Sequence, residues 1–224
     1  RAWREETGLP IFLNADHHKT FESAKYAIDA GYDSVQIDET ALTLEENMGV
    51  SKKVVEYAKS VNSDISVEGG LGYIRGSSEI HKEKIEVRPE DMTTPEDAKR
   101  FVSKTGVDRL AIVFGNIHGV SLAGNPRLDI ERLQAVHSAI PDVPLTLHGG
   151  SGIRDEDIKA TLAHGMSNIH VNTEIRVAYT NALRGALTQN PDETTPYKYL
   201  APAEEAARKI VEEKLRLFGA IDII

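Results

Sequence analysis

The chain has 224 residues, 40% of them hydrophobic, and a formal net charge of −9, so it can form one sizeable core. The acidic balance argues against nucleic acid and anionic membranes as partners, because both attract basic surfaces. The absence of cysteine excludes disulfides, thiolate nucleophiles and cysteine-ligated zinc. No apolar run is long enough to span a membrane, and no signal-peptide pattern opens the sequence. We therefore expect a cytoplasmic protein.

Short β-rich segments alternate with helical patterns along the chain. The expected strands are mostly continuous apolar runs, as is typical of parallel strands buried on both faces. They cover residues 10–16, 34–38, 64–68, 109–114, 143–148 and 168–172. Amphipathic helices are expected between them, for example over 93–106, where Thr94 can cap the helix and Pro95 suits its first turn. Six β-then-α units predict an α/β fold with a parallel sheet. Both a doubly wound sheet and a (β/α)₈ barrel are compatible with this order.

Polar residues fall where the expected strands end, which favours a barrel. Five strands end in Asp16-His17, Asp38, Glu68, His148 and Asn172, and His118 follows the sixth. In a barrel these ends converge on the face that carries the chemistry. His17, His118 and His148 could then meet, and three imidazoles with an open position are typical of catalytic zinc.

The stretch Asp16-His17-His18 allows more than one interpretation. Neighbouring strand residues face opposite sides, so His17 and His18 are not expected to bind the same ion. Asp16 could reach a substrate through a turn at the strand end. A phosphoesterase-type Asp-His-His motif would need further metal-binding aspartates, and Asp38 is the main candidate. Plain polar residues at a strand exit are the third alternative.

A glycine-rich loop, LHGGSGIRDED (residues 147–157), separates an expected strand from an expected helix. Backbone N–H groups in such loops can bind a phosphate at a helix N-terminus, and in barrels the last two loops often have this role. Asn172 and Thr173 follow the next strand. The sequence therefore predicts a phosphorylated small molecule beside a metal ion.

Six motifs in order, ADHH, SVQID, ISVEGGLG, GNIHGV, LHGGSGI and HVNTEIR, resemble the class II, metal-dependent fructose- and tagatose-bisphosphate aldolases. The resemblance runs from about Leu9 to the C-terminus. It implies a TIM-type (β/α)₈ barrel, here incomplete because the first two βα units of the family are missing. We expect one partial barrel domain over residues 1–224, with 190–224 as a C-terminal helical extension that packs on the barrel or on a second subunit.

The resemblance also implies roles for individual residues. His17, His118 and His148 would bind Zn²⁺, and Asp16 would be the acid/base that serves the aldehyde oxygen. Asp38 matches a position at or near a second metal location. A monovalent cation, Na⁺ or K⁺, would lie near the substrate phosphate. The residues expected to hold this phosphate are Gly119, Gly149, Gly150, Ser151, Asn172 and Thr173.

Three positions depart from the family pattern. Gly70 stands where the family has a glutamate of the alternate metal position, and Glu68 lies one step earlier on the same strand face. His170 stands where an asparagine is common, although histidine can also donate a hydrogen bond. The acid of the loop over residues 73–92 would fall at Ser78, so the adjacent Glu79 is the candidate.

The implied activity is reversible cleavage of a ketose 1,6-bisphosphate, with fructose 1,6-bisphosphate as the first choice. The products would be dihydroxyacetone phosphate and an aldehyde such as glyceraldehyde 3-phosphate, formed through a zinc-stabilised enediolate. A homodimer or homotetramer is expected. The alternatives are a catalytically impaired phosphosugar-binding relative and a different phosphosugar barrel enzyme such as an isomerase.

Overall fold

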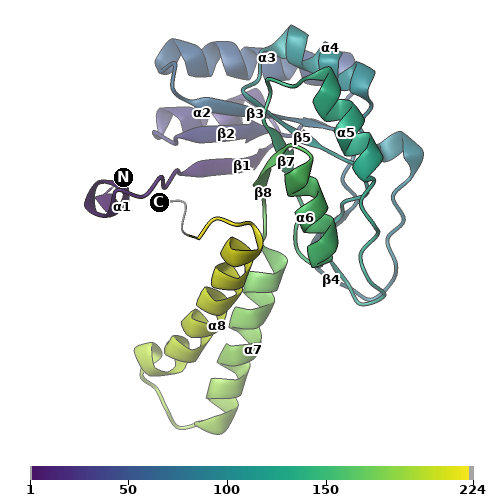
Figure 1. The fold of residues 1–224 in the computed structure, drawn as a ribbon. Helices are drawn as coiled ribbons and strands as arrows, with labels where there is room; N and C mark the ends of the chain where they lie inside the picture. The colour runs from purple at the N-terminus through teal and green to yellow at the C-terminus, as the bar shows by residue number, and fades with distance from the viewer. Residues whose placement is uncertain (1, 222–224) are drawn as a thin grey trace.

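The computed structural model describes residues 2–221 and is built around a curled, six-stranded parallel sheet (Figure 1). The strand order is β1-β2-β3-β5-β7-β8, so neighbouring strands follow the order of the chain. The bounds are β1 (Asn14–His18), β2 (Ser34–Ile37), β3 (Ser66–Leu71), β5 (Arg109–Ile112), β7 (Leu145–Leu147) and β8 (Met166–Ile169). Within residues 2–221, β1 pairs with β2 alone and β8 with β7 alone. The predicted incomplete barrel is therefore confirmed.

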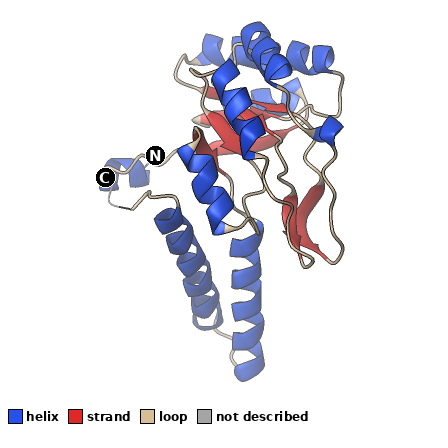
Figure 2. Ribbon diagram, turned by 45° about the vertical axis from the view of Figure 1, so that its right-hand side comes forward, coloured by secondary structure: helices blue, strands red, loops and turns tan. Residues whose placement is uncertain are grey.

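Helices connect the strands and cover the outer face of the sheet (Figure 2). They are α2 (Phe21–Asp29), α3 (Leu44–Val61), α4 (Pro95–Thr105), α5 (Ile130–Ala139) and α6 (Asp155–Ala163), while α1 (Ala2–Thr7) precedes β1. The hydroxyls of Thr20, Thr43 and Thr94 accept the backbone N–H three residues on, and each such cap stabilises a helix by about 1 kcal/mol. No helix within residues 2–221 is long and apolar enough to cross a membrane.

The two faces of the sheet differ in chemistry. The outer face packs apolar side chains against the helices, and Phe101 of α4 is fully buried over Gly69 of β3. A Cβ at Gly69 would come within 2.5 Å of the Phe101 ring, so glycine lets this helix approach the sheet closely. The inner face instead carries buried polar side chains, among them Gln36, Glu68 and Thr146. A polar inner face leading to the carboxyl ends of the strands supports the site described below.

A second, two-stranded sheet was not expected from the sequence. It pairs β4 (Gly76–His81) with β6 (His118–Ser121) in parallel. Both strands are short and β4 is mostly exposed, so they lack the apolar runs that identify a buried strand. A 3₁₀ turn, η1 (Pro89–Asp91), follows β4. This ribbon carries His118 and Ser78 to the site.

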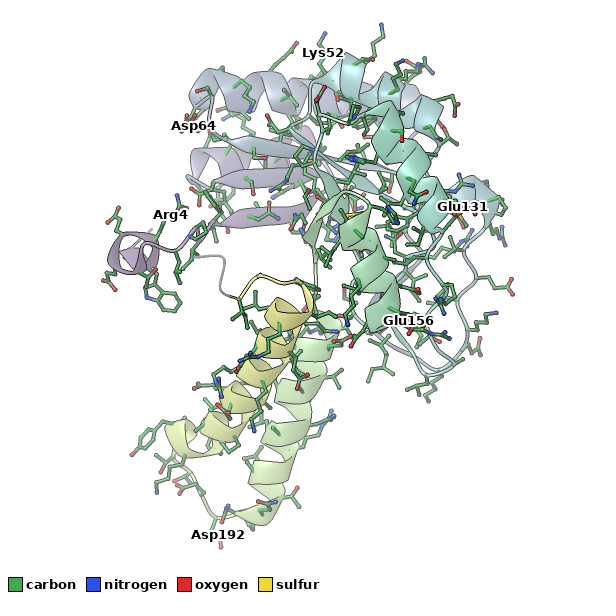
Figure 3. All side chains as sticks on the ribbon, in the orientation of Figure 1. Arg4, Lys52, Asp64, Glu131, Glu156 and Asp192 are labelled. Carbon is green, nitrogen blue, oxygen red and sulfur yellow. The ribbon has the colours of Figure 1, made fainter. Side chains whose placement is uncertain are left out.

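The C-terminal helices α7 (Thr173–Gln189) and α8 (Pro196–Leu217) pack on each other and project from the sheet (Figure 1). The expected domain division, with an extension from residue 190, stays a prediction; in the structure the projecting hairpin already begins with α7. Its labelled tip residue, Asp192, lies far from the sheet (Figure 3).

Several strand boundaries were wrong. The third strand was expected over 64–68 but spans Ser66–Leu71, so Glu68 lies within the strand and not at its end. The first and last strands differ most in their consequences. The first strand was expected over 10–16 but spans Asn14–His18, and Phe12 and Leu13 before it are largely exposed. The last strand was expected over 168–172 but spans Met166–Ile169, so Asn172 is the N-cap residue of α7. For the first and last strands, the polarity of the residues did not show where pairing with the neighbouring strand begins and ends.

Candidate active site

Four histidine rings gather at the carboxyl ends of the strands. The His17 ring centroid lies 5.1 Å from that of His118 and 4.9 Å from that of His148. The ring of His170 lies 4.1 Å from that of His148. One nitrogen each from His17, His118 and His148 lies within 4.8 Å of the others. Three imidazoles at this spacing suit a zinc-like ion.

The end of β1 turns so that two neighbouring side chains reach the same pocket. His17 has φ 57°, a left-handed conformation that is uncommon outside glycine, and the β1–β2 register is irregular between Ala15 and His18. The His17 N–H donates to Oε1 of Gln36 at 2.9 Å. This bend interrupts the alternation of the strand, so Asp16 and His17 both line the cavity beside His148, and His18 is not among its lining residues.

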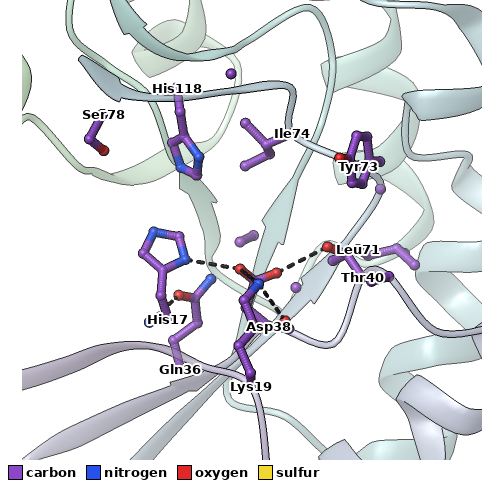
Figure 4. Close-up of a pocket in the computed structure, with 15 residues that line it drawn as sticks. His17, Lys19, Gln36, Asp38, Thr40, Leu71, Tyr73, Ile74, Ser78 and His118 are labelled. Carbon is purple, nitrogen blue, oxygen red and sulfur yellow. Dashed lines mark hydrogen bonds and ion pairs between the residues drawn. The ribbon is translucent and has the colours of Figure 1, made fainter.

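His17 is held by a carboxylate. Its Nδ1 lies 3.0 Å from Oδ2 of Asp38, which also binds Nζ of Lys19 at 2.7 Å (Figure 4). The hydrogen bond to Asp38 raises the pKa of His17. Burial opposes ionisation of Asp38, but His17 and Lys19 outweigh it and lower its pKa. Because Asp38 accepts from Nδ1, the lone pair of Nε2 is left for a metal ion.

His148 is held in the same way by Glu68. Its Nε2 lies 2.8 Å from Oε1 of Glu68, while Thr146 donates to Oε2 at 2.7 Å and Arg109 Nε lies 3.2 Å from it. Burial opposes ionisation of Glu68, but its partners, His148 first, lower its pKa. Glu68 therefore remains charged in the interior of the open barrel and orients His148.

His118 enters from the β4–β6 ribbon. Burial, followed by the proximity of His17 and His148, lowers its pKa to about 4. Its imidazole is thus neutral at pH 7, as a metal ligand must be. The donor chemistry of these three histidines fits a zinc-like ion.

Asp16 and His170 form a second pair at the same place. Oδ2 of Asp16 lies 3.4 Å from Nδ1 of His170 and 3.6 Å from Nε2 of His17. Nδ2 of Asn168 lies 3.1 Å from Nε2 of His170. Burial opposes ionisation of Asp16, but the hydrogen bond from His170 and the nearby histidines lower its pKa to about 2. Asp16 is therefore a carboxylate, able to accept a proton.

A small cavity of about 70 Å³ adjoins the histidines, lined in part by Gly119, Gly149, Ser151, Asn172 and Thr173. At Gly149, φ is 69° and a Cβ would lie 1.9 Å from the carbonyl oxygen of Ile117, so only glycine fits. Thr173 opens α7, whose N-terminus favours an anion. Gly150 is not a lining residue, and its N–H donates to the His170 carbonyl.

A larger pocket of about 340 Å³ opens on the other side of His17 and His118 (Figure 4). Gly70 lines it, and a Cβ there would lie 3.2 Å from Oδ1 of Asp38. Ser78 lines both cavities. Glu79 lines neither, since it is exposed and its carboxylate accepts a hydrogen bond from Ser77. In this structure the expected loop acid is therefore directed away from the histidines.

Sequence reasoning missed several residues that hold the site in place: Lys19, Gln36, Thr146 and Asn168. The sequence contained part of the information needed to find them. Gln36 lies two residues before Asp38, and Thr146 lies two residues before His148, so each pair shares one face of its strand. Such positions point into the barrel, and polar residues there require partners.

Comparisons with known proteins agree with this geometry. The family model described as "Fructose-bisphosphate aldolase class-II" matches residues 1–222. A fructose-bisphosphate aldolase of Staphylococcus epidermidis is 37% identical over 94% of this chain and 71% of its own length, and that of Staphylococcus aureus is 36% identical over the same shares. The structure of the YdjI aldolase from Escherichia coli K12 matches with a TM-score of 0.78 at 31% identity, covering 97% of this chain and 73% of the other.

A fructose-bisphosphate aldolase structure from Campylobacter jejuni, 22% identical with a TM-score of 0.75, shares the fold over 97% of this chain and 73% of its own. The fold and the histidine cluster fit a class of barrel lyases that is typically metal-dependent. The chain belongs to the class II fructose-bisphosphate aldolase family.

Proposed function

We propose that this protein reversibly cleaves fructose 1,6-bisphosphate to dihydroxyacetone phosphate and glyceraldehyde 3-phosphate. The observation that carries the proposal is the meeting of three imidazoles, a carboxylate and a glycine-lined cavity at a helix N-terminus. Family membership and the names of its relatives support the same reaction. A sugar phosphate is a cytoplasmic metabolite, so we retain a cytoplasmic location as part of the proposal.

His17, His118 and His148 would hold the divalent ion, with zinc as the proposed metal. Asp38 and Glu68 orient two of these rings through their second nitrogens. When bound, the ion supplies Lewis-acid polarisation of the ketose carbonyl. With a metal ion at these three histidines, the reaction requires no lysine Schiff base.

Asp16 would act on the C4 hydroxyl of the ketose. It accepts the hydroxyl proton as the C4 oxygen becomes the aldehyde carbonyl and the C3–C4 bond breaks. The electron pair of that bond passes to the three-carbon fragment, which leaves as an enediolate and is then protonated. His170, 3.4 Å from Asp16, holds the carboxylate in its charged form for this step.

The substrate phosphate would lie in the small cavity at the start of α7. The backbone of Gly119, Gly149 and Ser151, together with Asn172 and Thr173, surrounds this space. Gly150 is retained as a neighbour in the proposed loop, although its own N–H is engaged. A monovalent cation, Na⁺ or K⁺, completes the proposal, and replacing it with a tetraalkylammonium salt should raise KM.

The first experiment follows hydrogen exchange from solvent into dihydroxyacetone phosphate by NMR, with and without a chelator, alongside a cleavage assay with fructose 1,6-bisphosphate. Exchange that the chelator abolishes and zinc restores, together with cleavage, is the expected result. Exchange without cleavage of this sugar would point to another ketose. Absence of both from zinc-loaded protein would overturn the proposal.

Two observations favour a second candidate, a phosphosugar-binding protein with impaired turnover. Gly70 leaves no carboxylate beside Asp38, and Glu79 is directed away from the pocket. Calorimetric binding of dihydroxyacetone phosphate without any exchange would establish that alternative.

We further propose a homo-oligomer, a dimer or a tetramer. The projecting α7–α8 hairpin exposes apolar side chains, including Tyr197 at 75% and Leu215 at 41%, and an isolated hairpin gains stability by covering them. Sedimentation velocity distinguishes the monomer, with a mass near 24.6 kDa, from larger assemblies.

A further inference from the structure

The small cavity of about 70 Å³ beside the histidines has walls from three separate segments of the chain. Gly119 belongs to the β4–β6 ribbon, Gly149 and Ser151 to the loop between β7 and α6, and Thr173 to the start of α7. No single strand or helix sets the width of this cavity. The spacing of its walls therefore depends on side chains that join one segment to another.

Asn125 joins two of these segments without lining the cavity itself. Its Nδ2 donates one hydrogen bond to the carbonyl oxygen of Gly119 at 3.2 Å and another to that of Ser151 at 2.9 Å. Its Oδ1 accepts a hydrogen bond from the N–H of Ser121 at 2.8 Å. An asparagine side chain has two N–H donors and one carbonyl oxygen, so both donors and the acceptor are engaged.

The local backbone brings Asn125 to this position. A turn after β6, in which the Gly124 N–H donates to the Ser121 carbonyl at 2.9 Å, directs the chain back towards the ribbon. The glycine-rich loop accommodates the amide, since a Cβ at Gly152 would lie only 2.9 Å from Nδ2 of Asn125. A side chain at residue 152 would displace the amide, so the loop and Asn125 fit each other closely.

Ser151 attaches the third segment. Its buried hydroxyl oxygen accepts hydrogen bonds from the N–H groups of Asn172 and Glu174, each at 3.3 Å. Ser151 thus holds the start of α7 through its side chain and Asn125 through its backbone carbonyl. Any displacement of Ser151 would therefore also move the helix N-terminus that favours an anion.

A different asparagine makes the corresponding connection near the proposed metal ligands. The buried Asn116 donates from Nδ2 to the His148 carbonyl at 3.0 Å, and its Oδ1 accepts from the Phe114 N–H at 2.9 Å. Loss of Asn125 would leave this connection in place. The phosphate end of the site can therefore loosen while the histidines stay together.

We propose that Asn125 is a positioning residue for the substrate phosphate, because its amide holds Gly119 and Ser151 at the spacing that the phosphate requires. The inference rests on the proposed function, and it names a residue outside the cavity that sets the affinity for substrate. Without the amide, the two walls separate and the groups around the cavity no longer converge on one anion. The groups that act on the C3–C4 bond keep their places.

The test compares Asn125→Ala and Asn125→Asp with wild type, all as zinc-loaded proteins. Asn125→Asp keeps the shape and the acceptor but loses both N–H donors, so it remains informative if the alanine variant does not fold. Asn190→Ala and Asn190→Asp are the matched controls, since Asn190 is exposed at the end of α7 that lies away from the site. Circular dichroism establishes that each variant is folded.

Calorimetry measures the Kd of dihydroxyacetone phosphate, and steady-state cleavage of fructose 1,6-bisphosphate gives kcat and KM. Both Asn125 variants should raise Kd and KM by roughly ten-fold, the effect expected from losing a pair of hydrogen bonds. Their kcat should change much less, because an interaction that is equal in the ground and transition states affects KM alone. Zinc affinity, measured by chelator competition, should stay near that of wild type, and the Asn190 variants should match wild type throughout.

Unchanged Kd and KM in the Asn125 variants would overturn the proposal. A lower kcat at unchanged KM, or failure of both variants to fold, would overturn it as well, because either result is expected of a residue that only supports the fold. Cleavage by wild type with unchanged KM in the variants would leave the proposed function standing. Weaker binding by the variants, without cleavage by wild type, would support the positioning role and remove only the proposed reaction. No binding of dihydroxyacetone phosphate by wild type would overturn both.

Discussion

The carboxylate of Glu68 lies 2.8 Å from Nε2 of His148, and neither side chain is more than 1% exposed. A buried carboxylate is tolerated only with several partners, and here Thr146 and Arg109 complete the set. Glu68 thus fixes which nitrogen of His148 faces the pocket. Its position on β3 links the polar interior of the open barrel to the chemistry at its rim.

Glu68→Gln should weaken metal binding by roughly 10- to 100-fold, because the partner that orients His148 loses its charge. Competition with a zinc chelator measures this change. Thr146→Val is the matched control, since it removes a bond to Glu68 without touching His148, and its metal affinity should stay nearer to that of wild type. An unchanged affinity in Glu68→Gln would show that the pair does not orient the ligand.

Asp16→Asn should lower cleavage by roughly 100- to 10,000-fold, the usual range for loss of a general base. Hydrogen exchange into dihydroxyacetone phosphate should persist, because this half-reaction needs no proton transfer at the C4 oxygen. Steady-state cleavage and NMR exchange on the same zinc-loaded sample measure the two effects. Loss of both would mean that Asp16 also serves the three-carbon fragment or supports the metal site.

Gly70→Glu should add a second carboxylate to the large pocket, because the side chain would extend past Asp38. Gly70 is buried and Asp38 is partly buried, so repulsion between the two carboxylates should destabilise the metal-free protein by roughly 1–4 kcal/mol at a separation of about 4 Å. Added zinc should restore this loss. Gly70→Gln has the same shape without the charge, so it shares any steric cost of a side chain at this position but should lack the repulsion and the recovery with zinc. Urea unfolding with and without zinc distinguishes the two variants.

Asp91→Asn should loosen the loop that carries Ser78 and Glu79. Asp91 accepts two hydrogen bonds from the Arg75 guanidinium and one from the Arg88 N–H, and their loss should cost roughly 1–3 kcal/mol. Faster cleavage by trypsin within residues 73–92 would report the local change. Digestion at an unchanged rate would argue that other contacts hold the loop.

The Asp91 carboxyl should also make the free energy of unfolding depend on pH. Arg75, more than any other group, lowers the pKa of Asp91 below its ordinary value of 3.8. The wild-type protein therefore has this stabilisation above about pH 4 and loses it as the pH falls through the lower, folded value. Asp91→Asn should lack this part of the acid dependence. Urea midpoints between pH 3 and 7 for the two proteins measure the difference.

Much of the site was predictable because parallel strands bring their carboxyl ends together. His17, His118 and His148 lie far apart in sequence, yet the barrel hypothesis, based on polar residues at the strand ends, predicted that they could meet. The left-handed backbone at His17 was not predictable, because it depends on an irregular register with β2. The ribbon of β4 and β6 was missed because β4 is polar and mostly exposed and β6 has only four residues, so neither forms an apolar run. The direction of Glu79 depends on a local bond to Ser77 that composition does not reveal.

Of the three proposed metal ligands, His118 differs from His17 and His148 in the element that carries it. His17 and His148 belong to the large sheet, whereas His118 opens β6, which pairs only with β4 among the described strands. The carbonyl of Ser78, in β4, in turn accepts a hydrogen bond from Arg176 of α7. An ion held by His17, His118 and His148 would therefore bridge the large sheet and the β4–β6 ribbon. By reciprocity, a change in the ribbon that displaces His118 should weaken metal binding.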